Sequence, residues 1–374
     1  MKKSNNVFRS IFSAAILTAW IALMSIIAHA AQPFVLHLLD VGQGQSVLIE
    51  ADGHYMLIDG GGRSSSSFVV SYLKQQGIDH LDLIAVSHYD EDHMSGLIGA
   101  LSVFPDDELL LPSYEGEGSL YQSFFSAAIS NGASIQFPQM GDTYQLGGAT
   151  VEVVGPARFD YELENDRSLA FRISYGDLTC LICGDTEQTS EQDMVSSREN
   201  LSADVYVVNH HGSKTSSTDA FLDAVSPSYA LISCGLDNSY GHPAQEVLER
   251  FQNRSISMYR TDLQGTVVLY SDGSSYWFSQ EACQDWTPGI YKPQTREMPA
   301  PGGAGMPNDS LIETEDPAAP AGTYRYVCNT NTMKFHYPDC SSVTQMKEKN
   351  RMYTGLSREE LISDGYEPCG NCGP

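Results

Sequence analysis

The chain has 374 residues and a formal net charge of −26, from 47 acidic side chains against 21 lysines and arginines. Such a surface repels polyanions at long range, which argues against a protein that grips nucleic acid through a broad basic face. The length suits one large domain and a small one.

The N-terminus, residues 1–30, is expected to be a signal peptide. Lys2, Lys3 and Arg9 precede an apolar stretch over residues 11–27, and Ala28-His29-Ala30 fits a small-x-small cleavage site. Cleavage would leave a secreted or extracytoplasmic protein without stable membrane insertion. The alternative is a retained N-terminal anchor, since the apolar run is near the length that spans a bilayer.

Residues 31–285 are predicted to form an α/β domain, because apolar strand-like runs alternate with amphipathic segments. Several of the strands end in polar sequences rich in His and Asp. Strands are expected over 34–39, 46–49, 55–58, 81–86, 109–111, 133–137, 150–154, 169–174, 178–183, 204–208 and 229–233, and helices over 68–76, 120–130 and 244–252.

The polar sequence after the strand 81–86 places two His and two Asp within six residues. His88 and Asp90 can converge on one ion, and Asp92 and His93 can reach a second. Neutral imidazole with carboxylate is the ligand set of catalytic zinc, manganese or iron sites. The alternative, a polar loop with chance histidines, does not explain the position between a strand and a helical segment.

Two later strand ends carry further candidate ligands, Asp185 and the pair His210 and His211. The two oxygens of a carboxylate can face two cations, which suits Asp185. One histidine of the pair is expected to bind metal and the other to serve the substrate, in an order that the sequence leaves open.

Two residues near these strand ends are candidates for substrate contact. Lys214, among hydroxyl side chains, is predicted to clamp a phosphate, although an ordinary polar turn is the alternative. His242 precedes a helix and is predicted to hold a phosphate or act as an acid, unless it only caps its loop.

These stretches resemble, in chain order, the motifs of the metallo-β-lactamase superfamily. Asp59-Gly60-Gly61-Gly62 looks like the first motif, and the residues from His88 to His93 look like the second, with Asp90 where most members have a second His. The H-x-D-x-D-H variant is similar to the branch that contains the nuclease-like domain of ComEC competence proteins. Also similar are Leu39-Asp40-Val41-Gly42-Gln43-Gly44, His210-His211-Gly212-Ser213-Lys214-Thr215-Ser216 and Tyr240-Gly241-His242-Pro243.

Two departures from that branch or superfamily stand out. Gln45 occupies the place of the branch's Asp, so any contact of that Asp with the metal centre is expected to be weakened. Residues 165–168 supply no third-motif His, which leaves the metal position of His88 and Asp90 short of a ligand.

The resemblance, over residues 34–276, implies an αββα sandwich and an exported phosphodiesterase or nuclease acting on a phosphodiester, DNA or RNA included. It implies one or two zinc or manganese ions held by His88, Asp90, Asp92, His93, Asp185 and His210 or His211, with Asp92, His211, Lys214 and His242 in catalysis. The alternatives are hydrolysis of a non-nucleotide ester or lactam, and a non-catalytic metal-binding or DNA-contacting module. The absent histidines argue against β-lactams, and Asp185 with the His pair argues against a non-catalytic role.

Residues 286–323 are rich in proline and glycine and are predicted to be a linker. Residues 324–374 form a candidate zinc module, because His336-x3-Cys340 and Cys369-x2-Cys372 supply four N/S ligands for one structural zinc. A disulfide is the alternative in an exported protein. The module resembles the zinc-binding domain of the Ada DNA-repair protein, which has Cys where this chain has His336. We expect a structural or recruiting role and no methyl transfer.

Overall fold

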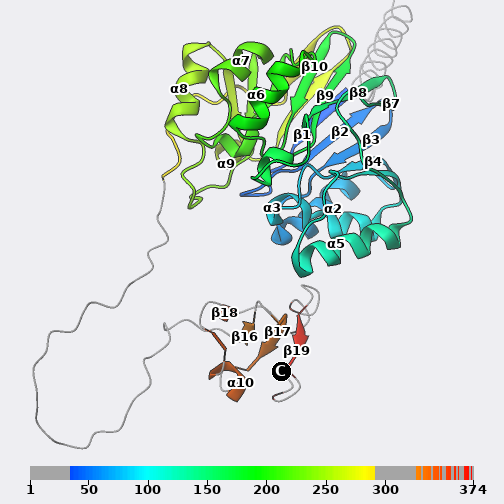
Figure 1. Ribbon diagram of the computed structural model, residues 1–374, viewed down its shortest axis with the longest axis vertical. Helices are drawn as coiled ribbons and strands as arrows, with labels where there is room; N and C mark the ends of the chain where they lie inside the picture. The colour runs from blue at the N-terminus through cyan, green and yellow to red at the C-terminus, as the bar shows by residue number, and fades with distance from the viewer. Residues whose placement is uncertain are drawn as a thin grey trace, which may run out of the picture. The chain divides into compact units, whose positions relative to one another are not determined.

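The computed structural model describes residues 34–290 and, nearer the C-terminus, residues 326–329, 332–337, 340–344, 346–347, 351–354, 358, 361, 366–369 and 372. The chain divides into two units, Met1–Thr295 and Arg296–Pro374 (Figure 1). The predicted signal peptide and most of the predicted linker lie outside the described residues. Across the described ranges, no helix combines the length and apolarity that crossing a membrane requires.

The first unit contains an eight-stranded sheet in the order β15-β14-β1-β2-β3-β4-β5-β6. Strands β3 to β6 are mutually parallel, so their carboxyl ends lie at one edge of the sheet. The strands are β1 (Phe34–Leu38), β2 (Val47–Ala51), β3 (His54–Ile58), β4 (Leu81–Ala85), β5 (Asp106–Leu110), β6 (Ser134–Gln136), β14 (Val267–Ser271) and β15 (Tyr276–Phe278).

A second sheet of seven strands has the order β13-β12-β11-β10-β9-β8-β7. Strands β10 to β13 are parallel, so the segments that follow them also begin at a common edge. The strands are β7 (Thr143–Leu146), β8 (Ala149–Gly155), β9 (Ala170–Tyr175), β10 (Leu178–Ile182), β11 (Val205–Val207), β12 (Tyr229–Ile232) and β13 (Ser257–Arg260).

Helices cover the outer faces of both sheets. Apolar side chains from both sheets form one core between them, including Leu36, Ile49 and Val151. Helices α2 (Ser66–Gln75), α4 (Leu97–Val103) and α5 (Gly118–Asn131) pack on the first sheet. Helices α6 (Gln188–Ser197), α7 (Asp219–Val225) and α8 (Gln245–Asn253) pack on the second sheet (Figure 1). This αββα arrangement confirms the predicted fold class. It also explains the almost continuous apolar strands, which are buried on both faces.

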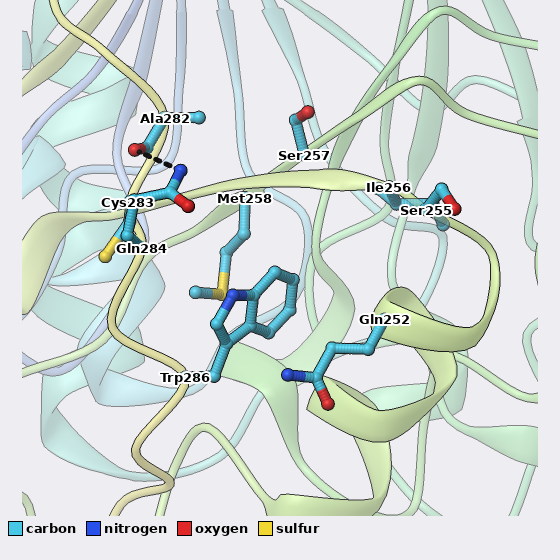
Figure 2. Close-up of a pocket in the computed structure, with 9 residues that line it drawn as sticks. All are labelled: Gln252, Ser255, Ile256, Ser257, Met258, Ala282, Cys283, Gln284 and Trp286. Carbon is cyan, nitrogen blue, oxygen red and sulfur yellow. Dashed lines mark hydrogen bonds between the residues drawn. The ribbon is translucent and has the colours of Figure 1, made fainter.

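The segment after β15 packs against the edge strand β13. The N–H of Cys283 donates to the Met258 carbonyl at 2.7 Å, and the N–H of Gly289 donates to the Pro243 carbonyl at 2.9 Å. Beside it lies a pocket of about 370 Å³, where the Trp286 ring lies next to the Met258 side chain (Figure 2). Residues 286–290, predicted as the start of the linker, therefore lie on the first unit, and Cys283 just before them covers the edge of β13.

The second unit has a four-stranded sheet in the order β18-β16-β17-β19. One small core contains Tyr326, Cys328 and Phe335. Its elements are β16 (Tyr326–Asn329), β17 (Lys334–His336), α10 (Ser341–Thr344), β18 (Arg351–Thr354) and β19 (Glu367–Pro368). A core of this size gives little stability by itself, which favours additional stabilisation by a bound metal ion.

Candidate metal centres

The main candidate centre lies where strand ends of the two sheets meet. Asp59 follows β3, and His88 follows the neighbouring parallel strand β4. Asp185 follows β10, and His211 follows the neighbouring parallel strand β11. The two sets are in contact, because the Nε2 atoms of His93 and His211 lie 3.3 Å apart.

Backbone contacts fix the loop that carries Asp92 and His93. The short helix α3 (Glu91–Met94) follows Asp90, and the N–H of Gln45 donates to the Asp92 carbonyl at 3.1 Å. Gly44 has φ +128°, and a Cβ there would lie 2.3 Å from the same carbonyl. Only glycine allows this approach, so the glycine-rich turn after β1 supports the metal loop.

Asp59 is fully buried and accepts four hydrogen bonds beneath the centre. Its Oδ1 accepts from the Ser87 N–H at 2.7 Å. Its Oδ2 accepts from the Ser87 hydroxyl at 2.7 Å, from His93 Nδ1 at 2.8 Å and from Gln45 Nε2 at 3.0 Å. Gln45 therefore contacts the carboxylate that orients His93, and its own side chain acts through that carboxylate.

These hydrogen bonds assign the protons of three histidines. His93 donates from Nδ1 to Asp59, and His211 donates from Nδ1 to the Ser233 carbonyl at 3.0 Å. The Ser87 hydroxyl gives its hydrogen to Asp59, so it accepts from His88 Nδ1 at 3.0 Å. In the neutral form of each ring, Nε2 then carries the lone pair.

The three lone pairs fit a bound cation. Within the part of the chain that the structure describes, His88 Nε2 is buried without a hydrogen-bond partner. The Nε2 atoms of His93 and His211, 3.3 Å apart, would repel each other as facing lone pairs unless a positive charge lies near both. The donor set is therefore chemically suited to divalent zinc or manganese.

Carboxylates complete the set. Asp185 Oδ1 lies 3.1 Å from His93 Nε2, and its Oδ2 lies 3.4 Å from His211 Nε2. Asp92 Oδ2 lies 3.5 Å from His211 Nε2, and Asp90 Oδ2 lies 3.6 Å from His88 Nε2. Two groups of potential ligands result, with His93 in both: His88, His93 and Asp185, and Asp92, His93 and His211.

Negative charge dominates the electrostatics of the centre. Burial opposes ionisation of Asp185, but the neighbouring His211 and His93 hold its pKa well below the usual range. Burial likewise opposes protonation of His211, but Asp185 and Asp92 raise its pKa to about 9. The metal-free centre thus attracts protons, and a divalent cation would compete with them for the same atoms.

His210 and His211 sit in a strained turn. Their φ values are 50° and 56°, in the left-handed region that non-glycine residues rarely adopt. Buried Glu191 holds the turn by accepting from Asn209 Nδ2 at 2.9 Å and from the Ser217 N–H at 2.6 Å. The turn buries His211 in the centre. His210 Nε2 is farther from Asp185, at 3.7 Å, and its Nδ1 lies 3.4 Å from Glu187.

His242 lies beside the histidine pair, with ring centroids 5.4 Å from His210 and 6.2 Å from His211. Burial, together with the nearby histidines, lowers its pKa to about 3. A neutral imidazole at pH 7 can donate a hydrogen bond to a phosphate but holds no second proton to give. Lys214 is exposed in the following turn, outside the buried cluster.

The region of the missing third-motif histidine supports the centre without supplying a ligand. The Ser168 hydroxyl accepts from the Asp185 N–H at 3.3 Å. Asp166 Oδ1 accepts from the N–H groups of Glu187 and Ser190 at 3.1 Å each, at the start of α6. Ser168 thus holds Asp185 through its backbone, and Asp166 holds the start of the helix that follows it.

Sequence reasoning did not identify Ser87, Ser233, Glu187 or Glu191 as parts of the centre. Ser87 follows the expected strand 81–86, and Ser233 ends the expected strand 229–233. Their position at a strand end was the one sequence feature that could have identified them. Glu187 is the N-cap residue of α6 and Glu191 lies on it, and neither position carried a sequence signal of a role in the centre.

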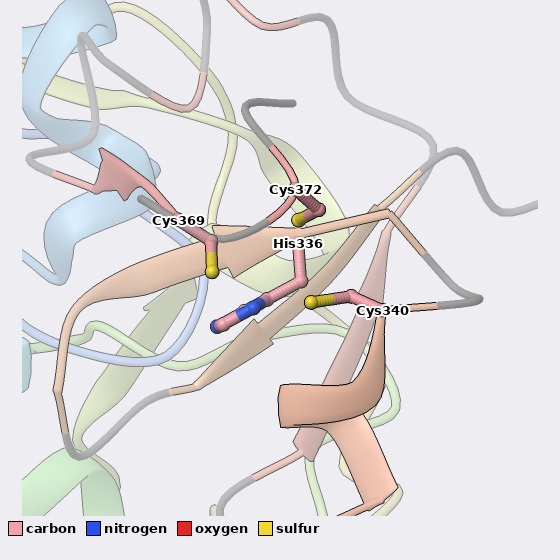
Figure 3. Close-up of side chains that lie close together, drawn as sticks. All are labelled: His336, Cys340, Cys369 and Cys372. Atoms are coloured by element: carbon pink, nitrogen blue, oxygen red, sulfur yellow. The ribbon is translucent and has the colours of Figure 1, made fainter.

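The second unit contains a separate cluster of His336, Cys340, Cys369 and Cys372, whose ligand atoms lie within 4.8 Å of one another (Figure 3). Among the described residues, His336 Nδ1 is buried with no hydrogen-bond partner, and no two cysteines are joined in a disulfide. Burial, with Cys340 and Cys369 close by, raises the pKa of Cys372 to about 11. Three thiols and an imidazole form a closed set that fits structural zinc, which would bind the thiols as thiolates.

Comparison with known proteins places these features among relatives. The model of a family described as the metallo-beta-lactamase superfamily matches residues 39–236. ComE operon protein 3 of Bacillus subtilis (strain 168) is 31% identical over 248 residues, covering 62% of this chain and 32% of the relative. Competence protein ComA of Neisseria gonorrhoeae is 32% identical over 230 residues, covering 61% of this chain and 31% of the relative. The chain thus spans about a third of the length of these relatives.

Solved structures are more distant. The diiron β-hydroxylase CmlA of Streptomyces venezuelae has 15% identity and a TM-score of 0.45, covering 65% of this chain and 55% of that one. The metallo-β-lactamase fold protein YhfI of Bacillus subtilis has 15% identity and a TM-score of 0.41, covering 60% and 95%.

Proposed function

The chain belongs to the metallo-β-lactamase superfamily, a family of metal-dependent hydrolases, and from this premise we propose that it cleaves phosphodiesters outside the cytoplasm. The observation that carries the proposal is the convergence of three Nε2 lone pairs with the carboxylates of Asp92 and Asp185. The choice of phosphodiester rests on sequence similarity to proteins named for competence. A third relative, 31% identical over 234 residues, is named Recombination protein 2 of Haemophilus influenzae. These names point to DNA as a substrate.

In this proposal His88, His93 and His211 hold the metal through Nε2, and Asp90, Asp92 and Asp185 hold it through their carboxylates. A divalent cation supplies Lewis-acid charge for the phosphoryl group and favours ionisation of water near neutral pH. His211 is the ligand of the histidine pair, because its Nε2 lies within 3.5 Å of both Asp92 and Asp185.

The remaining polar groups act on the substrate. His242, neutral at pH 7, donates a hydrogen bond to a phosphate oxygen. Its Nδ1 is buried without a partner, as expected for a group that a ligand satisfies. Lys214, on the exposed turn, approaches a phosphate as a mobile point charge. Asp59 and Ser233 hold two imidazoles in the required tautomer throughout.

Substitution at the centre tests the reaction. Asp92→Ala and His93→Ala should each abolish hydrolysis of a small phosphodiester by the manganese- or zinc-loaded full chain. Circular dichroism should show an intact fold, because both residues lie on the short helix α3 and belong to none of the apolar cores of the first unit. Asp142→Ala, an exposed aspartate before β7, is the matched control and should keep wild-type turnover. Unchanged turnover in metal-replete Asp92→Ala would remove the catalytic assignment.

The net charge of −26 predicts how a polyanionic substrate binds. Few phosphates are neutralised by protein cations, so the affinity for single-stranded DNA should fall only shallowly with salt. Comparing kcat/KM for a small diester and for single-stranded DNA across a salt series measures this. A steep salt dependence would contradict the reasoning about the surface. A metal-loaded chain that cleaves carboxylic esters and neither diester would favour the non-nucleotide alternative.

We also propose that the second unit is a structural zinc module bound through His336, Cys340, Cys369 and Cys372. The support is the closed set of four ligands, of which Cys340 and Cys369 belong to a small buried cluster with Val327. Whether it resembles the Ada module beyond this ligand pattern stays a prediction.

A further inference from the structure

Three aromatic rings form a column from the metal centre to the surface. The rings of His211 and His242 are stacked, with centroids 6.2 Å apart and planes at 28°. The rings of His242 and Tyr240 are stacked as well, with centroids 5.6 Å apart and planes at 23°. His211 and His242 are 3% and 8% exposed, whereas Tyr240 is 61% exposed. The column therefore begins at a candidate metal ligand and ends at solvent.

The loop that carries Tyr240 is held by hydrogen bonds between the Asn238 side chain and the backbone of Tyr240 and His242. Asn238 Oδ1 accepts from the N–H of Tyr240 at 3.1 Å and from the N–H of His242 at 3.0 Å. Asn238 Nδ2 donates to the His242 carbonyl at 2.6 Å. The Gly289 N–H donates to the carbonyl of Pro243, the next residue along. The loop thus presents Tyr240 outward in a defined orientation.

The Tyr240 ring stacks on His242 and is still more than half exposed, so a large part of its surface faces solvent. Two further large apolar side chains are exposed. Leu236, in the loop that carries Tyr240, is 69% exposed, and Ile290, in the segment after β15, is 71% exposed. The Tyr240 loop and the segment after β15 therefore carry exposed apolar side chains, and the two segments are joined by the hydrogen bond from Gly289 to Pro243. A substrate with only a charged phosphate has no use for this surface, whereas one with planar bases does.

We infer that Tyr240 is a stacking platform for a base of a single-stranded oligonucleotide whose phosphate lies at the metal centre. The inference rests on the proposed function and names its substrate class. Stacking accepts any base because every base has a π-face. It also does not depend on protein cations, so it supplies affinity that a chain with a net charge of −26 cannot obtain from counter-ion release.

The test measures binding and hydrolysis separately on the full chain. Binding uses a fluorescein-labelled oligothymidylate of about ten nucleotides, within the range that single-strand binding domains cover. The comparison probe is an abasic oligonucleotide with the same number of phosphates. Anisotropy is recorded in an Asp92→Asn background to suppress turnover, with and without Tyr240→Ala.

Tyr240→Ala should weaken binding of the oligothymidylate by about 5- to 150-fold, the range found when an aromatic that stacks on a base is removed. It should leave binding of the abasic probe unchanged. Tyr240→Phe and Tyr240→Trp should restore the affinity, because each keeps an aromatic face. Phe137→Ala removes another exposed aromatic, 50% exposed, from outside the loops of the centre and should have no effect.

Two results would overturn the inference. Equal weakening for both probes would mean that Tyr240 acts only by supporting His242, and unchanged binding of the oligothymidylate would place the bases elsewhere. Hydrolysis of both probes by the chain with Asp92 intact reports on the reaction itself. Its absence would reject the proposed phosphodiesterase, while a base-dependent effect of Tyr240 on binding would still identify the platform.

Discussion

Asp59→Asn tests the idea that hydrogen bonds beneath the centre fix the histidine tautomers. The substitution keeps the size of the side chain but replaces one carboxylate oxygen with an NH2 group. The remaining oxygen can still accept from the Ser87 N–H. The new NH2 group faces three donors, the Ser87 hydroxyl, Gln45 Nε2 and His93 Nδ1.

His93 can relieve this conflict by moving its proton from Nδ1 to Nε2. Nε2 lies 3.1 Å from Asp185 Oδ1, so the relocated proton would form a hydrogen bond with that carboxylate. His93 Nε2 and Asp185 Oδ1 would then be hydrogen-bonded to each other and less available to bind a metal. Losing the hydrogen-bond partner of a metal-ligating histidine typically weakens metal affinity 10- to 100-fold, which corresponds to about 1.4–2.7 kcal/mol of binding free energy. Disrupted hydrogen bonds to a buried carboxylate should also lower stability by about 3 kcal/mol.

Competition with a chromophoric chelator measures the zinc affinity, and ¹⁵N chemical shifts of the histidine side chains report the tautomer. Asp52→Asn is the matched control, because Asp52 also accepts two hydrogen bonds, from the Gly148 N–H and the Tyr175 hydroxyl, at a surface turn. Its zinc affinity should equal that of the wild type. If Asp59→Asn binds zinc as tightly as the wild type, with Nδ1 of His93 still protonated, the tautomer argument is refuted.

Two further predictions concern stability and the second unit. Burial raises the pKa of Asp106 from its ordinary value of 3.8 to about 8, so between those pH values the folded state binds more protons and stability falls as the pH rises. Asp106→Asn should therefore raise the free energy of unfolding by about 3–4 kcal/mol more at pH 8 than at pH 5, measured by thermal denaturation. An equal change at both pH values would contradict this. In the second unit, Cys369→Ser should lower the zinc content of the full chain by about one ion, measured by mass spectrometry. A disulfide between Cys369 and Cys372 in wild-type protein prepared without oxidant would argue against zinc.

The sequence by itself determined the order of the strand ends and the chemistry gathered there. His88, Asp92 and His93 lie within a few residues, so their common location follows from local geometry. The alternation of apolar strands and amphipathic helices predicted an α/β domain, and the resemblance to the metallo-β-lactamase superfamily implied the αββα sandwich. Short elements escaped this local reasoning, including β7, β13 and β15 of three or four residues. Their apolar residues are too few to establish a period.

The tertiary structure decided which groups meet across long stretches of chain. His93 and His211 are 118 residues apart in sequence, and Ser233 donates from its hydroxyl to the Gly44 carbonyl across 189 residues. The proposed choice of His211 over His210 as a ligand rests on the strained turn after β11, and the contact of Gln45 with Asp59 is likewise set by the fold. The pairing of strands and the packing of two sheets set these contacts. Periodicity along one segment carries no record of them, because it reports only which face of that segment is buried.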